Sequence, residues 1–175
     1  MLGSKKIIFP AAVLIIAAGL GWFFLAGNDT EAPGGDNRIP LPDLFFRDYE
    51  GQEIKLADFR GRPMVVNTWA SWCPFCVEEL PVFASAQEEI GDQITFVLIN
   101  RAETLQAAQR FSGQVGVTGR LVLLLDPADS FYKSIGGFSM PETIFVDKEG
   151  FIIQHKRGPM PLEEIRRRIK EAFGL

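Results

Sequence analysis

The stretch Met64–Pro81, MVVNTWASWCPFCVEELP, contains both cysteines of this 175-residue chain. Its first seven residues, 64–70, are mostly apolar or β-branched, a pattern that predicts a buried strand. Pro74 then favours the first turn of a helix, where the N–H that proline lacks would have no partner. The stretch therefore predicts a buried strand, a short turn and a helix that begins beside Cys73.

The two cysteines are placed for redox chemistry. Cys73 stands at the predicted helix N-terminus, where unpaired N–H groups and the helix dipole favour an anion. That anion would be the thiolate, which is the reactive form of cysteine. Cys76 follows one helical turn later, so its sulfur is within reach of Cys73. We therefore predict that the pair forms a reversible disulfide.

Two structural interpretations of the cysteine pair are weaker. A disulfide that closes so short a loop constrains the unfolded chain little and would stabilise the fold poorly. A structural zinc site normally needs four protein ligands, whereas this chain has two cysteines and one histidine, His155. We expect no metal and no other cofactor. His155 falls on a predicted strand far from the motif, and no functional role is expected for it.

The motif resembles thioredoxin-fold active sites, and most closely those of membrane-anchored TlpA/ResA-type oxidoreductases, which include the DsbE/CcmG-like cytochrome c biogenesis branch. The resemblance covers roughly residues 38–172 and rests on Trp72-Cys73-Pro74-Phe75-Cys76 and Glu79-Leu80-Pro81. Thioredoxin itself has a buried Asp six residues before its first cysteine, where this chain has Asn67, as the TlpA/ResA group usually does. The resemblance implies a thioredoxin-like α/β fold, with a central mixed β-sheet flanked by helices and an N-terminal β-hairpin addition.

The resemblance also suggests residues that support the dithiol. Glu79 matches a carboxylate that would tune the dithiol or relay its protons, although it could instead be a solvated helix residue. Asn67 is expected to form hydrogen bonds beneath the site. Trp72 is expected to pack beside the dithiol and shape the docking surface, and Pro74 and Phe75 to influence its redox poise.

A second match lies in residues 137–143, GFSMPET, which resemble the loop whose cis-proline faces the dithiol in thioredoxin folds. The Met140–Pro141 bond is therefore expected to be cis, although most X–Pro bonds are trans. Met140 is less usual at its position, which bears on substrate preference. Glu142 and Thr143 after the proline are similar to the cytochrome c biogenesis branch.

The N-terminal residues 1–26 are predicted to form a single-pass membrane anchor. Lys5 and Lys6 precede a 20-residue uncharged run, and 20 residues at ~1.5 Å each span about 30 Å, the thickness of a hydrocarbon core. A cleaved signal peptide is the alternative, but its apolar region is usually about 7–15 residues long. Lysines before the run and acids after it place the N-terminus in the cytoplasm. The domain would then lie outside the cytoplasmic membrane, where disulfide chemistry is sustained.

The remaining chain divides into a flexible linker at residues 27–40, rich in Gly and polar residues, and a thioredoxin-like domain at residues 41–175. The active-site helix should run from 74 to about 90 and end at Gly91. In the second predicted helix, Leu105, Ala108 and Phe111 should face inward. The other predicted elements are a hairpin with arms at 44–46 and 52–56, strands at 94–100 and 121–125, helices at 103–111, 129–135 and 161–173, and a hairpin over 143–154.

The charge balance excludes one class of partner. Without residues 1–26 the chain has 16 basic and 22 acidic residues, a net charge of −6. A nucleic-acid partner requires clustered positive charge, so none is expected.

The expected activity is extracytoplasmic thiol:disulfide exchange in the direction of reduction of protein disulfides, with apocytochrome c as a candidate substrate. Cys73 would attack a substrate disulfide, Cys76 would resolve the mixed disulfide, and a membrane thiol protein would donate the electrons. A disulfide-forming oxidase would use the same residues in reverse. A peroxiredoxin would need Thr or Ser where this chain has Ala70, and a non-enzymatic binding module would normally have lost a cysteine.

Overall fold

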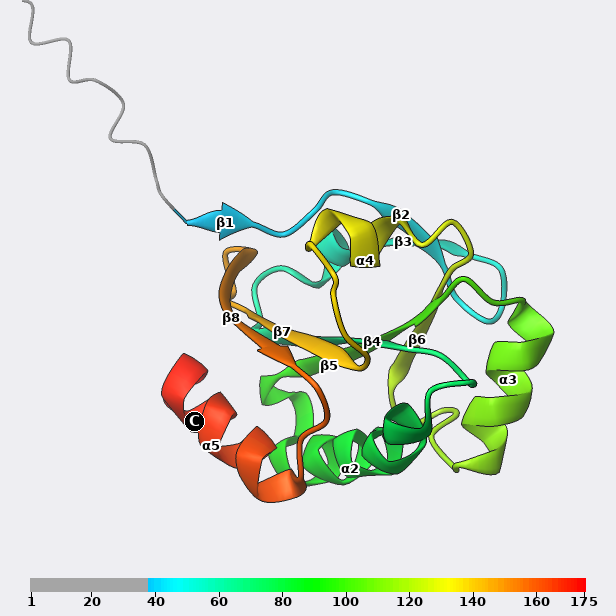
Figure 1. Ribbon diagram of the computed structural model, residues 1–175. Helices are drawn as coiled ribbons and strands as arrows, with labels where there is room; N and C mark the ends of the chain where they lie inside the picture. Colours follow the sequence, from blue (N-terminus) through cyan, green and yellow to red (C-terminus); the bar gives the residue numbers. More distant parts are fainter. Residues whose placement is uncertain (1–37) are drawn as a thin grey trace, which may run out of the picture. The chain divides into compact units, whose positions relative to one another are not determined.

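The computed structural model describes residues 38–175 (Figure 1). The predicted anchor, residues 1–26, and linker residues 27–37 lie outside this part of the chain. Among residues 38–175, no helix has both the length and the apolar character needed to span a membrane. Residues 39–40, which the sequence assigned to the end of the linker, form a strand, so the folded domain begins before residue 41.

The described residues form one eight-stranded mixed sheet with the order β1-β8-β7-β4-β5-β6-β2-β3. Strands β4, β5 and β6 are parallel, and every other pairing is antiparallel. Parallel central strands buried on both faces explain the near-continuous apolar runs in the sequence. The strands are β1 (Ile39–Pro40), β2 (Phe45–Arg47), β3 (Glu53–Lys55), β4 (Met64–Trp69), β5 (Thr95–Arg101), β6 (Val122–Asp126), β7 (Glu142–Val146) and β8 (Phe151–Arg157).

Helices cover the sheet on both sides: α2 and α5 lie below it and α4 above it in Figure 1. Helix α2 (Pro74–Ile90) has the predicted bounds and ends at Gly91, whose φ of 65° favours glycine. The others are α3 (Leu105–Gln114), α4 (Ser130–Ser134) and α5 (Leu162–Phe173), with short 3₁₀ helices at Leu56–Phe59 and Gly91–Gln93.

Two apolar clusters fill the space between sheet and helices. Alternate residues of β4 serve each one: Val65 and Trp69 face the cluster with α2 and α5, and Met64 and Val66 face the cluster with α4. Phe111 of α3 stacks on Trp69, with ring centroids 5.6 Å apart. The mixed-sheet α/β architecture is therefore confirmed.

One local prediction differs from the structure, and the structure adds a further pairing to another. Leu105, expected to face inward, is the first residue of α3 and is 38% exposed, while Ala108 is fully buried. The N-terminal hairpin forms as predicted, but β2 also pairs with β6, so the hairpin extends the central sheet at its edge.

Candidate active site

The dithiol lies where β4 gives way to α2. The Cys73 N–H donates to the carbonyl of Ala70 at 3.1 Å, which closes the turn after β4. Cys73 is the N-cap of α2 and Pro74 is the first helical residue, as predicted. Cys73 and Cys76 form a disulfide, with their Cα atoms 5.3 Å apart.

The two sulfurs differ in their surroundings. The Cys76 N–H donates to Sγ of Cys73 at 3.2 Å, so the helix terminus already directs a donor at that sulfur. Such a donor, together with the helix dipole, stabilises a thiolate at Cys73. Cys73 is 3% exposed and Cys76 is completely buried. Cys73 is therefore the sulfur that a substrate reaches first.

Two aromatic side chains flank the cysteines in sequence and face solvent. Trp72 is 59% exposed and Phe75 is 56% exposed, whereas Trp69 is fully buried in the core. Large exposed apolar side chains beside a reactive group suit contact with a partner. The docking role predicted for Trp72 stays a prediction that this placement fits.

Glu79 is buried beneath the site rather than solvated, so the solvated alternative is wrong. Its side chain accepts hydrogen bonds from Nδ2 of Asn67 at 3.0 Å and from the Met160 N–H at 2.9 Å. Burial raises the pKa of Glu79 to about 8, against the lowering effects of these two hydrogen bonds and of the nearby Lys156 charge. At neutral pH Glu79 is thus mostly protonated, and its pKa lies near enough to neutral pH for it to act in proton transfer.

Asn67 is fully buried and connects two elements under the dithiol, as expected. Besides Glu79 on α2, its Nδ2 donates to Oγ1 of Thr143 on β7 at 3.0 Å. On its other side Glu79 lines a hollow of about 340 Å³ beside Pro159, Met160 and Pro161. Glu79 therefore borders this hollow as well as its buried partner Asn67.

The Met140–Pro141 peptide bond is cis, which confirms the prediction. Glu142, the next residue, pairs with Thr68 of β4, so the proline lies at the end of the sheet where β4 leads to the cysteines. Met140 packs against the apolar cluster that contains Cys73 and Cys76. The loop and the dithiol, 65 residues apart in sequence, therefore border the same core.

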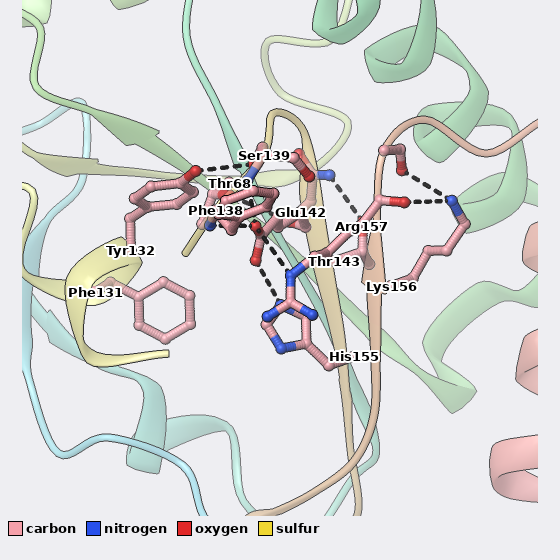
Figure 2. A network of polar contacts seen from close by, with 12 residues as sticks. Thr68, Phe131, Tyr132, Phe138, Ser139, Glu142, Thr143, His155, Lys156 and Arg157 are labelled. Carbon is pink, nitrogen blue, oxygen red and sulfur yellow. Dashed lines mark hydrogen bonds and ion pairs between the residues drawn. The ribbon is translucent and has the colours of Figure 1, made fainter. Parts of the chain in front are cut away.

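Glu142 ties this loop to the neighbouring strand (Figure 2). Its buried Oε1 accepts the N–H groups of Phe138 and Ser139 at 2.6 and 2.7 Å, and its Oε2 lies 2.6 Å from Nε2 of His155. Burial alone would raise the pKa of Glu142, but these contacts outweigh it and hold the pKa below its ordinary value. Glu142 is therefore a fixed anion.

His155 contacts the loop through Glu142, a partner that the sequence did not indicate. Glu142 stands opposite Arg157 in the β7–β8 ladder. His155, two residues before Arg157, therefore projects on the same face. Only the strand register brings the histidine here, so the sequence offered no local indication.

Glu103 was also missed, although it holds the turn that carries the cysteines. Its carboxylate accepts the Ser71 N–H at 2.8 Å, the Ser71 hydroxyl at 2.5 Å and Nδ2 of Asn100 at 2.7 Å. Ala102 before it has a φ of 55°, a left-handed conformation that is uncommon for alanine. That bend directs Glu103 back toward Ser71, two residues before Cys73.

Within residues 38–175, no group of three or more His, Cys, Asp or Glu side chains is arranged to hold a metal ion. The reactive groups brought together in the described site are the two sulfurs and the carboxyl of Glu79. A disulfide at a helix N-terminus, with a buried titratable carboxylate below it, can exchange two electrons with another thiol pair.

Comparison with known proteins agrees with this geometry. Residues 36–171 match the Redoxin family model. The thiol-disulfide oxidoreductase ResA of Geobacillus thermodenitrificans is 27% identical over 168 residues, which cover 95% of each chain.

Solved structures show the same architecture. MTB dsbF, in its mixed oxidized and reduced forms, superposes with a TM-score of 0.70 at 26% identity over 77% of this chain and 98% of that one. A secreted Mycobacterium tuberculosis disulfide oxidoreductase homologous to E. coli DsbE shares the fold, with a TM-score of 0.66 at 22% identity over 74% of this chain and 96% of that one. The chain therefore belongs to the Redoxin family, as a thioredoxin-fold thiol:disulfide oxidoreductase of the TlpA/ResA type.

Proposed function

We propose that this protein is a membrane-anchored, extracytoplasmic reductase of protein disulfides. The observation that carries the proposal is the asymmetric Cys73–Cys76 pair. The outer sulfur lies at the N-terminus of α2 and accepts an N–H, while the inner one is completely buried. Such a pair separates the attacking role from the resolving role.

In the proposed reaction, the Cys73 thiolate attacks one sulfur of a substrate disulfide. The substrate S–S bond breaks, one substrate thiolate leaves, and a mixed disulfide forms. The Cys76 thiolate then attacks Sγ of Cys73 and releases the second substrate thiolate. Two electrons pass to the substrate, and the enzyme is left with its disulfide.

Proton transfer is assigned to Glu79. The Cys76 thiol must lose a proton before it can attack, and Glu79 lies three residues further along α2, on the same side of the helix. Its pKa of about 8 lets it accept and return a proton near neutral pH. The hollow beside Pro159–Pro161 would pass that proton on to solvent.

The cellular setting follows from the sequence. The uncharged run in residues 1–26 supports a single-pass anchor, with the lysines before it in the cytoplasm and the domain outside. A membrane thiol protein would then reduce the Cys73–Cys76 disulfide after each turnover. Pro141-Glu142-Thr143 resembles the cytochrome c biogenesis branch, which makes apocytochrome c a candidate substrate.

A trapping experiment tests the proposal. In Cys76→Ser, Cys73 can still attack but nothing resolves the mixed disulfide, so a covalent complex with substrate should accumulate on non-reducing gels. Cys73→Ser is the matched control, and it should trap far less because its remaining sulfur is buried. Mass spectrometry of the trapped species distinguishes apocytochrome c from a broad set of exported proteins.

Two outcomes would contradict the proposal. If Cys76→Ser traps nothing and the wild-type protein also fails to reduce a model disulfide, the reductase function is wrong. If the Cys73/Cys76 reduction potential is as oxidising as that of a disulfide-forming enzyme, about −120 mV, the direction is reversed.

A further inference from the structure

Phe138 is the most exposed of the large apolar side chains among residues 38–175. It is 86% exposed, compared with 59% for Trp72 and 56% for Phe75. It stands three residues before the cis-proline, in the loop between α4 and β7. A phenylalanine side chain this exposed contributes little to the packing of the core. An exposed large apolar side chain of this kind suits contact with another molecule.

The backbone beneath Phe138 is nevertheless held firmly, as Figure 2 shows. Its own N–H and that of Ser139 both donate to Oε1 of buried Glu142. The carbonyl of Ser139 accepts the Tyr132 hydroxyl at 3.0 Å. Gly137 lies directly on the Tyr132 ring, because a Cβ added there would come within 2.5 Å of it.

Tyr132 is in turn fixed by its neighbours. The Arg101 guanidinium lies 3.5 Å from the centre of its ring. Arg101 also forms a two-pronged ion pair with Asp129, with Nε–Oδ1 and Nη2–Oδ2 distances of 2.7 and 2.5 Å. The loop that presents Phe138 is thus immobilised from two sides, which lowers the entropy cost of binding through that side chain.

The position of Phe138 relative to the dithiol is bounded by chain geometry. Consecutive Cα atoms are 3.8 Å apart, so Phe138 lies at most about 11 Å from Pro141. Pro141 directly precedes Glu142, which pairs with Thr68 near the end of β4, and Met140 packs on the cluster that contains both cysteines. The loop that carries Phe138 therefore adjoins the cluster that contains the dithiol.

We propose that Phe138 is a specificity-determining residue, which contacts a large apolar side chain of the substrate polypeptide close to its reacting cysteine. This inference rests on the proposed reduction of protein disulfides. An extended chain rises about 3.3 Å per residue, so the separation of at most about 11 Å between Phe138 and Pro141 corresponds to roughly three residues of a substrate segment whose reacting cysteine lies beside Pro141. The preferred substrate is thus an extended segment with an apolar residue about three positions from the cysteine.

The test uses two symmetric peptide disulfides as probes. One peptide carries leucine three residues before and three residues after its cysteine, and the other carries serine at both positions. Reduction of each by the reduced wild-type protein is followed by stopped-flow tryptophan fluorescence. We expect the leucine peptide to react about tenfold faster, the discrimination typical of one apolar contact.

Three variants make the test specific. Phe138→Ala should lose most of the preference by slowing the leucine peptide alone, and Phe138→Leu should retain it. Phe45→Ala is the matched control, because Phe45 is 59% exposed and lies on β2 near the sheet edge, away from the dithiol. It should leave both rates unchanged.

The outcomes separate this inference from the function on which it rests. If wild-type protein reduces neither peptide, the proposed function fails. If it reduces both at equal rates, or if Phe138→Ala keeps the preference or slows both peptides equally, the assignment of Phe138 is overturned while the reductase function stands.

Discussion

Two buried glutamates, Glu79 and Glu142, lie on opposite faces of the same sheet and have opposite protonation behaviour. Thr143 projects toward α2 and bonds Asn67, which bonds Glu79. Glu142, one residue earlier on β7, therefore projects toward the other face. Glu79 is 1% exposed and Glu142 is 0% exposed, yet the pKa of one is raised to about 8 and that of the other is lowered.

The difference lies in their donors. Glu79 receives one backbone N–H and one amide N–H, and Lys156 acts on it from a greater distance. Glu142 receives two backbone N–H groups, touches His155 and has the Arg157 guanidinium 3.6 Å away. Burial makes the charged form of both carboxyl groups costly. Only the surroundings of Glu142 supply enough hydrogen-bond donors and positive charge to stabilise the carboxylate. One carboxylate can therefore exchange a proton, and the other can only hold structure.

The largest effect should come from removing the structural anion. In Glu142→Ala, the Phe138 and Ser139 N–H groups lose their buried acceptor, and the His155 ring and the Arg157 guanidinium lose their buried partner. We expect a loss of about 3 kcal/mol or more in the free energy of unfolding, measured by urea denaturation.

Two controls accompany that variant. Glu142→Gln keeps an acceptor for the loop N–H groups and should recover part of the loss, so it serves if Glu142→Ala does not fold. Glu78→Ala changes an exposed glutamate on α2 and should have little effect. A loss for Glu142→Ala no larger than that for Glu78→Ala would show that Glu142 is not the anchor of this loop.

A smaller effect should appear in the pH dependence of stability. The folded protein keeps a proton on Glu79 up to about pH 8, whereas the unfolded chain releases it near 4.5. Between these values the folded state binds more protons, so stability should fall as pH rises, by at most 1.4 kcal/mol per pH unit. From pH 6 to 7.5 the Glu79 contribution is therefore about 2 kcal/mol.

Urea unfolding of the oxidised protein at several pH values measures this slope without titrating the cysteines. Glu79→Gln should flatten the curve between pH 6 and 7.5. Glu142→Gln should leave that slope in place, because the lowered pKa of Glu142 contributes stability that is lost only below about pH 4.5. An unchanged slope in Glu79→Gln would refute the raised pKa.

These two glutamates also mark what the sequence could predict. The bounds of α2 follow from local chemistry, Pro74 at its start and Gly91 at its end, and both were predicted. Glu79 was singled out through the family resemblance, and its raised pKa comes from burial in the folded core, where its backbone hydrogen-bond partner Met160 is 81 residues away. His155 was missed because its contact with Glu142 arises from strand register, which no local pattern encodes.

The smallest effect concerns a third carboxylate, Glu103, which is only partly buried but has three donors, two of them from Ser71. Glu103 tests whether hydrogen-bond donors to a carboxylate contribute to stability when the carboxylate is only partly buried. Glu103→Gln replaces one acceptor oxygen by an NH₂ group that faces other donors, which should cost about 1 kcal/mol. If that cost is concentrated in the turn before Cys73, the open form of the turn becomes about fivefold more populated.

Cys73 alkylation in the reduced protein measures this opening, because the closed turn leaves Cys73 only 3% exposed. We expect the rate to rise by up to about fivefold in Glu103→Gln. The matched control is Glu78→Gln, since the Glu78 side chain makes no hydrogen bond or ion pair to any other residue in the range 38–175. Its alkylation rate should equal that of the wild type. Equal alkylation rates in Glu103→Gln and Glu78→Gln would mean that Glu103 stabilises the loop before α3 but does not position Cys73. The three hydrogen bonds to this partly buried carboxylate would then not be needed to hold the turn closed.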